Sequence, residues 1–553
     1  MSGSHDAGHS SQNEQLSEGT DKSVEIDAGV EPEASASTDV AAHVVETAET
    51  VEAADTADTT DAATDSHGFY HLGQNTVIEA GSQMHGMPEM SIGSGVFMRT
   101  GAWFNICTEV TGERPKIIVG DGCQFNVGVS VSAANRIVLE RFSIYGHHSY
   151  ITDTQHEYRQ IGIPIIMQGI TRVDDETIIG EGTWVGANCI IGGGIRIGRG
   201  SVIGANSVVT RSLPDYCVAV GSPARIVKMF DTEAADWISA RTPEEIEAVM
   251  RRRRERPVLS ICIPTYNRAS DLLRCLHSIV MQTGDCTLIE IVVSDNASPD
   301  GTQQVLETFA AQHSNCNLRY WRNEENIGAE RNIVKLLDEA RGDYMLLHGD
   351  DDFFHDMTIM PLLHLINTNR SSSVIFIDVL NDNAQVESGE GLDAFIARAS
   401  INSGFLSSVI LERAIYEQME DKSAFIGTGF NHIYLQLEAI RRKPGFTAIN
   451  KSMFAYAGND PAGYNFGEYF IAGYLRILRH FEQRGLSAEA LKHEKGNMLA
   501  STILPWYKRI VEQGLGTDLT GFEDIYTAHY KDEPYYEAVL AWIRDVKRPE
   551  QAE

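Results

Sequence analysis

The chain has 553 residues, 42% of them hydrophobic and 22% charged, so it can bury a core and its length suits three or four domains. The formal net charge of −32 argues against nucleic acid as a partner, because an acidic chain repels phosphates. The eight cysteines form no C-x-x-C pair, and no stretch approaches the ~20 apolar residues of a membrane span. These features indicate a protein of the reducing cytoplasm.

Residues 1–66 form an acidic leader. They contain 16 Asp and Glu residues against one Lys, and they have no aromatic side chain. Such a segment cannot bury enough apolar area to offset the entropy lost on ordering, so we expect disorder. A solvating role is the simplest interpretation, and a functional tail is the alternative.

Residues 67–230 carry a repeat of six residues. Neither the helical period of 3.6 nor strand alternation produces it, and a fixed six-residue period predicts a solenoid of short parallel strands, with three hexads to each triangular coil. The repeat is interrupted between Thr152 and Thr177, and we expect this insertion to leave the coil as a loop. The repeated aliphatic positions are Ile179, Val185, Ile191, Ile197, Ile203 and Val209.

The interruption contains His156, three residues after Asp153. Acyl transfer from a thioester needs a general base near the acceptor, and a neutral imidazole oriented by a carboxylate can provide it. We therefore interpret His156 as a base and Asp153 as its orienting partner. The alternative is a structural or surface histidine, which is the commoner role of an isolated His.

These motifs, together with Gln168 and the closing segment Gly221-Ser-Pro-Ala-Arg225, resemble the hexapeptide-repeat acetyltransferases that act on sugars and xenobiotics. The resemblance implies a left-handed parallel β-helix, a homotrimer, and acetyl-CoA bound between neighbouring β-helices with His156 as the base. Packing at a coil corner is the alternative role of Trp184, and chain turning is that of the glycines. The resemblance further implies substrate positioning by Asn126 and coenzyme binding by Trp184, Gly186, Ala187, Ala205, Arg225 and Lys228.

Residues 231–256 are predicted to form a helical linker that ends in a basic run, 251–256. Two interpretations stay open. The run can contact anionic lipid head groups at the inner face of the cell membrane. It can equally be the solvated end of a helix, where cations face the negative pole of the helix dipole.

Residues 257–469 alternate predicted strands with predicted helices, which is typical of βαβ units and a mostly parallel sheet. Residues 470–553 read as a helical region whose role the sequence does not rank. The strands are expected at 258–263, 289–293, 318–321 and 344–347, and the helices at 270–281, 302–312 and 329–341.

Polar motifs follow these strands, at the sheet edge where open α/β sheets bind ligands. Asp350, Asp351 and Asp352 come directly after an apolar strand. Such a triplet repels itself unless a cation neutralises it, and carboxylates suit Mg²⁺ or Mn²⁺, which would offset charge on a departing nucleoside diphosphate. An acidic turn is the alternative for the triplet alone.

Over about residues 257–445 these motifs resemble inverting family 2 glycosyltransferases of the Rossmann-like α/β GT-A fold. The resemblance implies a nucleotide-sugar donor and a metal held by Asp350 and Asp352, with Asp352 the strongest candidate ligand. The residues that it places around the donor are Pro264, Thr265, Asn267, Arg268, Asp295, Asn326 and Arg331.

An inverting transfer also needs a base for the acceptor hydroxyl. In many relatives this base is the Asp of a Glu-Asp pair that opens a helix. Here the comparable helix opens at Phe430, and Asn431 and His432 stand at the place of the pair. We hypothesise that His432 is the base, with Asp421 as the alternative.

For the whole chain we predict a bifunctional enzyme of bacterial surface-polysaccharide biosynthesis, of the O-antigen or capsule type. It would acetylate a sugar, with a hydroxyl favoured over an amine, and would glycosylate a saccharide or lipid-linked glycan. One alternative is a glycosyltransferase whose β-helix is an inactive trimerisation scaffold. Another is a polysaccharide-binding protein without transferase activity.

Overall fold

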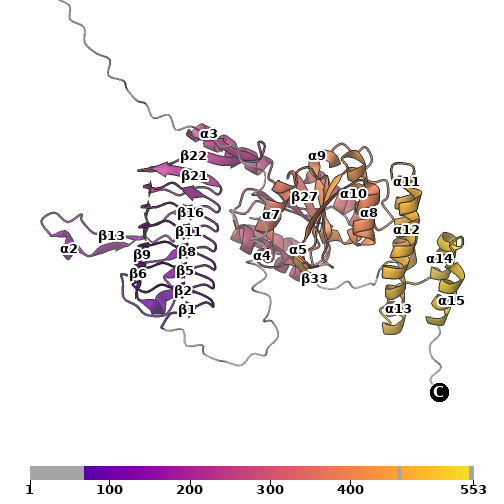
Figure 1. The fold of residues 1–553 in the computed structure, drawn as a ribbon, viewed down its shortest axis with the longest axis horizontal. Helices are drawn as coiled ribbons and strands as arrows, with labels where there is room; N and C mark the ends of the chain where they lie inside the picture. Colours follow the sequence, from indigo (N-terminus) through magenta and orange to yellow (C-terminus); the bar gives the residue numbers. More distant parts are fainter. Residues whose placement is uncertain (1–67, 173, 285, 381, 457–462, 547–553) are drawn as a thin grey trace, which may run out of the picture. The chain divides into compact units, whose positions relative to one another are not determined.

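The computed structural model describes residues 68–546 except 173, 285, 381 and 457–462, and the predicted acidic leader lies outside this range. The described part begins with short parallel strands stacked in three sheets (Figure 1). The first sheet contains β1 (His71–Leu72), β4 (Met90–Ile92), β7 (Ile117–Val119), β10 (Ile137–Leu139), β15 (Thr177–Ile179) and β18 (Arg196–Ile197). The second contains β2 (Val77–Ile78), β5 (Phe97–Met98), β8 (Gln124–Phe125), β11 (Ile144–Tyr145), β16 (Trp184–Val185), β19 (Val202–Ile203) and β21 (Cys217–Gly221). The third contains β3 (Gln83–His85), β6 (Trp103–Ile106), β9 (Ser130–Ala133), β12 (Tyr150–Thr152), β17 (Ile190–Ile191) and β20 (Val208–Val209).

The six-residue period of the sequence is the register of this stack. Each repeated aliphatic residue ends a strand, and successive hexads belong to successive sheets. Partners in neighbouring coils are eighteen residues apart, so three hexads make one coil, and all six side chains are at most 1% exposed. The predicted parallel β-helix is therefore confirmed. The pairs are Ile179 with Ile197, Val185 with Ile203, and Ile191 with Val209.

The last coil ends in an antiparallel hairpin, where a helical linker was expected. Strand β22 (Ala224–Asp231) turns back into β23 (Asp236–Ser239), because the Asp231 carboxylate accepts the backbone N–H groups at the start of the turn. Helix α3 (Pro243–Glu255) follows, and Thr242 and Glu245 form its capping box. The predicted helix over 231–256 is thus shorter than expected.

The basic run at the end of α3 contacts the protein itself. Four of its five arginines are engaged in ion pairs or in hydrogen bonds to backbone carbonyls. These contacts favour the helix-end interpretation over a free cationic surface for lipids. They join Arg252 to Asp231, Arg254 to Glu247, Arg256 to Asp343, and Arg253 to the carbonyls of Asp215, Tyr216 and Phe230.

An eight-stranded, mixed α/β sheet follows, and the predicted strands are present in it. Its first four strands are parallel neighbours and the rest are mixed. A two-stranded ribbon, β28 (Asp352–Phe354) with β33 (Phe454–Tyr456), adjoins it. In spatial order the sheet contains β26 (Leu318–Arg322), β25 (Ile289–Asp295), β24 (Leu259–Thr265), β27 (Tyr344–Leu347), β31 (Val409–Glu412), β29 (Val374–Ile377), β32 (Gly445–Ile449) and β30 (Val386–Glu390).

Helices cover both faces of this sheet. Alternate residues of β24 point to opposite cores, with Ile261 and Ile263 in one and Cys262 in the other. The first core contains α4 (Ala269–Thr283), α5 (Thr302–Gln312) and α7 (Ile359–Thr368). The second contains α6 (Ala329–Glu339), α8 (Leu392–Ala399) and α10 (Asn431–Arg442), while the short α9 (Arg413–Tyr416) follows β31.

The C-terminal helices extend the second core. Tyr474, Ile477 and Leu478 are fully buried, in the same cluster as Ile433 and Leu437 of α10. Packing is therefore one role of this region. No helix in the described ranges is both long and apolar enough to cross a bilayer. The helices are α11 (Tyr474–Glu482), α12 (Ala488–Met498), α13 (Leu504–Gln513), α14 (Phe522–Tyr530) and α15 (Tyr536–Val546).

Candidate active sites

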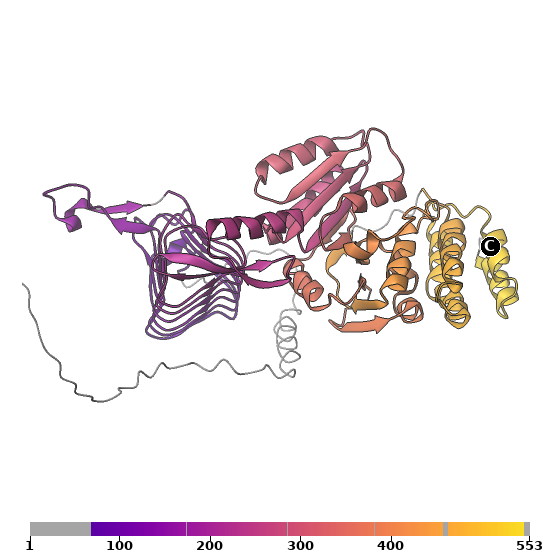
Figure 2. The ribbon, with the colours of Figure 1, turned by 90° about the horizontal axis from the view of Figure 1, so that it is seen from above.

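The β-helix is interrupted after β12 by an antiparallel hairpin rather than by a loop. Strands β13 (Thr154–His156) and β14 (Ile170–Arg172) pair, and α2 (Ile165–Gln168) lies between them. The Gln168 carboxamide bonds to the backbone of Gln160 and Ile163, which closes the tip. Figure 2 shows this segment, residues 153–172, extending away from the coils. We call it the arm.

His156 lies in β13, exposed to solvent, whereas Asp153 is fully buried at the base of the arm. The Asp153 carboxylate accepts the backbone N–H groups of Ala134 at 2.6 Å and Asn135 at 2.9 Å. Within the described residues no hydrogen bond joins Asp153 to His156. The carboxylate therefore caps a coil corner, because unpaired buried N–H groups would be costly. Asp153 was expected to orient His156, but its carboxylate contacts the backbone of Ala134 and Asn135 instead.

The residues expected to bind coenzyme lie on other parts of the β-helix. The Trp184 side chain, in β16, is 55% exposed, and Gly186 and Ala187 form the corner that follows. A Cβ on Gly186 would meet the backbone N of Ala205 at 2.6 Å, so the close approach of the next coil alone requires glycine here. Asn126, two coils earlier at the same corner, donates its Nδ2–H to the Tyr145 carbonyl at 3.2 Å.

These residues and His156 occupy different corners of one chain. The corner of Gly186 connects the second sheet to the third, whereas the arm connects the third sheet to the first. Arg225 and Lys228 lie exposed in β22, beyond the last coil. A single chain thus does not bring the predicted base to the predicted coenzyme residues.

The second candidate site lies at the carboxyl ends of β24, β25 and β27. Asp350 is 6% exposed, and its two oxygens accept hydrogen bonds from Thr265 Oγ1 at 2.6 Å and Arg268 Nη1 at 3.1 Å. Arg268 also pairs with Asp351. Asp352 is 4% exposed and begins β28, where Ser407 Oγ donates to its Oδ2. The structure therefore brings Thr265, Arg268, Asp350 and Asp352 together, as expected.

Burial shapes the charge of this cluster. It raises the pKa of Asp350 to about 6, against the opposing effects of Thr265 and Arg268. It likewise raises the pKa of Asp352 to about 6, with neighbouring carboxylates adding to the shift. Desolvation and like charge both disfavour the ionised form, so the cluster gains by binding a cation.

Asp295 ends β25, and one of its two carboxylate oxygens accepts no hydrogen bond among the described residues. It is fully buried, and its Oδ1 accepts hydrogen bonds from the backbone N–H and hydroxyl of Ser298. Its Oδ2 accepts no hydrogen bond within the described residues, and Arg322 Nε lies 3.4 Å away. Asn267, at φ +57°, donates its N–H to Ser298 Oγ, which joins the ends of β24 and β25. Pro264 pairs with Ser294 inside the sheet.

A network of amides positions the segment after β26. Asn296 Nδ2 donates to Asn326 Oδ1 at 2.8 Å, and Asn326 Oδ1 also accepts the N–H of Gly328. Asn323 donates to both Asn296 and Asn332, whose side chain is fixed in turn on β25. Asn326 is therefore held beside the end of β25, and the sequence did not single out its supporting asparagines.

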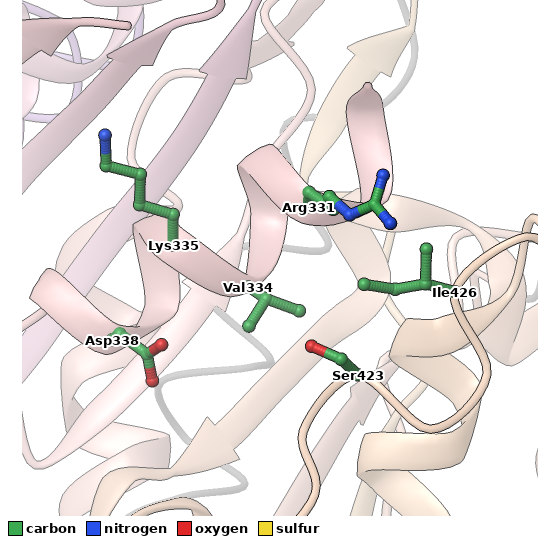
Figure 3. Close-up of a pocket in the computed structure, with 6 residues that line it drawn as sticks. All are labelled: Arg331, Val334, Lys335, Asp338, Ser423 and Ile426. Carbon is green, nitrogen blue, oxygen red and sulfur yellow. The ribbon is translucent and has the colours of Figure 1, made fainter. Parts of the chain in front are cut away.

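Arg331 lies further along α6 and lines a pocket of about 440 Å³ against the loop before α10. Its side chain extends toward Ile426, whereas that of Lys335 points away from the loop (Figure 3). Lys335 is held by Asn323 Oδ1 at 2.7 Å, and Asp338 by Lys422 at 2.6 Å. Arg331 is the cation of this pocket whose side chain makes no hydrogen bond or ion pair among the described residues.

His432 lies in the first turn of α10, 7% exposed. Its Nε2 lies 2.8 Å from the Gly404 carbonyl, which can only accept, so Nε2 carries the proton and Nδ1 the lone pair. Burial lowers the pKa of this imidazole. Asp421 is exposed, and its carboxylate accepts the N–H of Ser423.

Ser407 contacts the Asp motif, although no sequence pattern singles it out. Its hydroxyl accepts the Gly349 N–H at 2.8 Å and donates to Asp352, so it fixes both ends of the Asp motif. It comes from a 3-10 turn, η3 (Leu406–Ser408), 55 residues after Asp352. A lone serine in an irregular segment carries no pattern from which this contact could be found.

The chain matches two family models. Residues 260–431 match the glycosyl transferase family 2 model, and residues 176–211 match the bacterial transferase hexapeptide model of six repeats. These regions coincide with the α/β sheet and with the last coils of the β-helix. The chain therefore contains a region that matches family 2 glycosyltransferases and a region that matches the hexapeptide repeats of bacterial transferases.

Each of the following relatives covers only part of this chain. The abequosyltransferase RfbV of Salmonella typhimurium is 26% identical over 278 residues, which cover 45% of this chain and 81% of that protein. Two further curated relatives are matched over only 33% and 40% of their length. The solved structure of AntD, an N-acyltransferase from Bacillus cereus, in complex with dTDP and coenzyme A, is 21% identical with a TM-score of 0.26, covering 33% of this chain and 89% of that one. S. aureus TarS in complex with UDP-GlcNAc is 18% identical with a TM-score of 0.37, covering 52% and 88%.

Proposed function

We propose that this chain is a bifunctional enzyme of bacterial surface-polysaccharide biosynthesis. It transfers an acetyl group from acetyl-CoA to a sugar, and it transfers a glycosyl group from a nucleotide sugar with inversion. The observation that carries the proposal is the pairing, in one chain, of a hexapeptide β-helix whose arm bears His156 with a family 2 domain whose strand ends gather buried carboxylates. Similarity to an abequosyltransferase supports the polysaccharide setting.

In the glycosyl transfer, the acceptor hydroxyl attacks the anomeric carbon while the bond to the diphosphate breaks, and a base takes the hydroxyl proton. Nδ1 of His432 is suited to this role, because Nε2 is already protonated against Gly404 and burial keeps the ring neutral. The buried Asp295 Oδ2 offers an acceptor to the nucleotide. The pocket at Arg331 supports a further contact with an anionic substrate group.

A divalent cation, Mg²⁺ or Mn²⁺, fits this site in its chemistry. Asp350 and Asp352 would hold it, since hard cations prefer carboxylate oxygens, and it would offset charge on the departing diphosphate. Among the described residues, no three His, Cys, Asp or Glu side chains are grouped so that they could already hold a metal ion. Arg268 engages two of the carboxylates instead.

For the acetyl transfer we propose a homotrimer with the site between copies. The arm that bears His156 and the corner after Trp184 connect different pairs of sheets, so the two residues lie apart in one chain. This separation supports a site between copies. The arm supports it too, since it exposes a run of large apolar side chains that its own chain leaves uncovered. Their exposed fractions are 101% for Ile161, 53% for Ile165, 80% for Ile166, 74% for Met167 and 67% for Tyr158.

The proposal also covers the acceptor substrate and the place of the reaction. A saccharide or lipid-linked glycan would be modified in the cytoplasm, at the inner face of the cell membrane. The capping role of Asp153 favours one second candidate, in which the β-helix only assembles the trimer.

The test separates the two reactions in one protein. A thermal-shift screen of nucleotide sugars with Mn²⁺, and of acetyl-CoA, identifies the donors. Release of CoA and of nucleoside diphosphate is then followed in the wild type, His156→Ala and Asp352→Asn, with saccharide acceptors present. We expect His156→Ala to lose only CoA release and Asp352→Asn to lose only diphosphate release. Wild type that transfers glycosyl groups but shows no acceptor-stimulated CoA release would establish the scaffold, and no turnover at all would establish a binding protein.

A further inference from the structure

Arg268 is the counter-ion of the carboxylate cluster in this structure. Its Nη1 lies 3.1 Å from Asp350 Oδ1 and is also bonded to Asp351 Oδ2. Among the described residues no other cation forms a salt bridge with Asp350, Asp351 or Asp352. The remaining oxygen of Asp350 is taken by Thr265 Oγ1. Arg268 therefore occupies oxygens that a metal ion approaching Asp350 would need.

The two sides of this ion pair differ in their access to water. The Arg268 side chain is 45% exposed, whereas that of Asp350 is 8% exposed and that of Asp351 is 24% exposed. The guanidinium can therefore leave toward solvent at little cost. The carboxylates cannot follow it, and a buried unpaired charge is strongly unfavourable. Arg268 should leave only when another cation replaces it.

The released guanidinium would stand at the mouth of the donor site. It belongs to the loop between β24 and α4, whose neighbour Asn267 is tied to Ser298 at the end of β25. Arginine presents a planar fork of donors that matches the oxygens of a diphosphate. The Arg268 guanidinium, once it has left the carboxylates, is therefore well suited to bind the phosphates of the donor.

We infer that Arg268 is an exchange cation, which neutralises Asp350 and Asp351 until a divalent metal displaces it and which then binds the diphosphate of the donor. This inference rests on the proposed glycosyl transfer. It makes metal and donor binding cooperative, because the metal frees the arginine and the diphosphate retains it in its new position. Without metal, Arg268 neutralises the carboxylates, and with metal and donor bound, it contacts the diphosphate.

The inference predicts effects of opposite sign from one substitution. Arg268→Gln removes the competitor, so Mn²⁺ alone should bind about tenfold more tightly, as expected for the loss of one charge-assisted contact. The nucleoside diphosphate should bind about tenfold more weakly in the presence of saturating Mn²⁺, since the fork is gone. A residue that only held the loop in place would weaken both.

The measurement uses the full-length protein at pH 7.5. Free Mn²⁺ is titrated by electron paramagnetic resonance, and UDP, GDP, CDP and dTDP by calorimetry with saturating Mn²⁺, keeping the one that binds the wild type most tightly. Arg341→Gln is the matched control for net charge, because this exposed arginine precedes β27 at the opposite end of the strand. We expect it to match the wild type in both titrations.

The outcomes separate the inference from the proposed function. Unchanged or weaker Mn²⁺ binding by Arg268→Gln overturns the exchange, while wild type that binds Mn²⁺ and a nucleoside diphosphate keeps the glycosyltransferase proposal. Wild type that binds neither overturns both. The ligand-free Arg268→Gln variant should melt at a lower temperature than the wild type, because the buried Asp350 loses its counter-ion. A cooperative melt above the assay temperature excludes unfolding as the cause of either change.

Discussion

At the scale of single residues, the proposed role of His432 as a base can be separated from its structural contact. Its Nε2–H holds the Gly404 carbonyl, and its Nδ1 is available to take a proton. A glutamine places its Nε2 amide close to the position of the histidine Nε2, so it can keep the first role without the second.

We expect His432→Gln to retain nucleoside diphosphate binding and the wild-type melting temperature, while glycosyl transfer falls by about 10²–10⁴-fold, the usual contribution of a general base. His432→Ala should lose the Gly404 contact as well. Initial rates and diphosphate titrations on both variants check this. Full transfer activity in His432→Gln would show that the histidine only positions the chain and would favour Asp421 as the base.

Sequence motifs predicted which polar residues gather at the strand ends better than they predicted the contacts that these residues make. Asp350, Asp352 and Asp295 follow apolar strands, and the geometry of a parallel sheet brings strand ends to one edge. Ser407 reaches Asp352 from an irregular turn. Arg268 was expected to meet the nucleotide, but its ion pairs with Asp350 and Asp351 depend on side-chain directions that no spacing records.

At the scale of elements, the base of the arm depends on Asp153. Its carboxylate accepts two backbone N–H groups at a buried corner. The amide of an asparagine has one acceptor oxygen and turns a donor toward the other N–H, so one hydrogen bond is lost and one donor is left unpaired.

Asp153→Asn should therefore destabilise the β-helix by about 1–3 kcal/mol. We expect a lower melting temperature in differential scanning calorimetry and an unchanged rate of acetyl transfer per folded molecule. Asp175→Asn, at an exposed position shortly after the arm, is the control and should melt like the wild type. If Asp153→Asn were as stable as the wild type but slow in acetyl transfer, the Asp153 carboxylate would instead be assigned to orienting His156.

The predictability of each element follows from its periodicity. The hexads could be read from the sequence because each burial position repeats in every coil. The hairpin within the arm and strand β23 were not predicted, because both are short and their pairing is antiparallel within an otherwise parallel repeat. Helix α3 was predicted but placed too early, since Asp236–Ser239 carries no strand pattern of its own.

At the scale of the whole molecule, the apolar arm predicts how copies associate. Each large aliphatic side chain gains roughly 1.5–3 kcal/mol on full burial, so three of them can decide whether a trimer persists. We expect the combined change Ile161→Ser, Ile166→Ser and Met167→Ser to shift the protein from trimer to monomer at micromolar concentration. Multi-angle light scattering after gel filtration measures this directly.

Acetyl transfer should fall in the same variant while glycosyl transfer stays, because only the proposed acetyl-transfer site lies between copies. The control removes three exposed apolar side chains of the α/β domain, Met281, Leu380 and Val386. A stable trimer of the arm variant would mean that the coils alone hold the copies together. The arm would then be free to cover a substrate rather than a neighbour.

The stacked register also works as a ruler. Strand β12, which leads into the arm, is followed in its sheet by β17 and then β20. Each added strand raises the stack by about 4.8 Å, so the height between His156 and the final hairpin with Arg225 is set in whole steps by the number of coils. Insertion of one eighteen-residue coil between them would keep every buried contact in register yet lengthen the span by one step. In the proposed acetyl transfer, the distance that acetyl-CoA would span between His156 and Arg225 could therefore change only by whole coils.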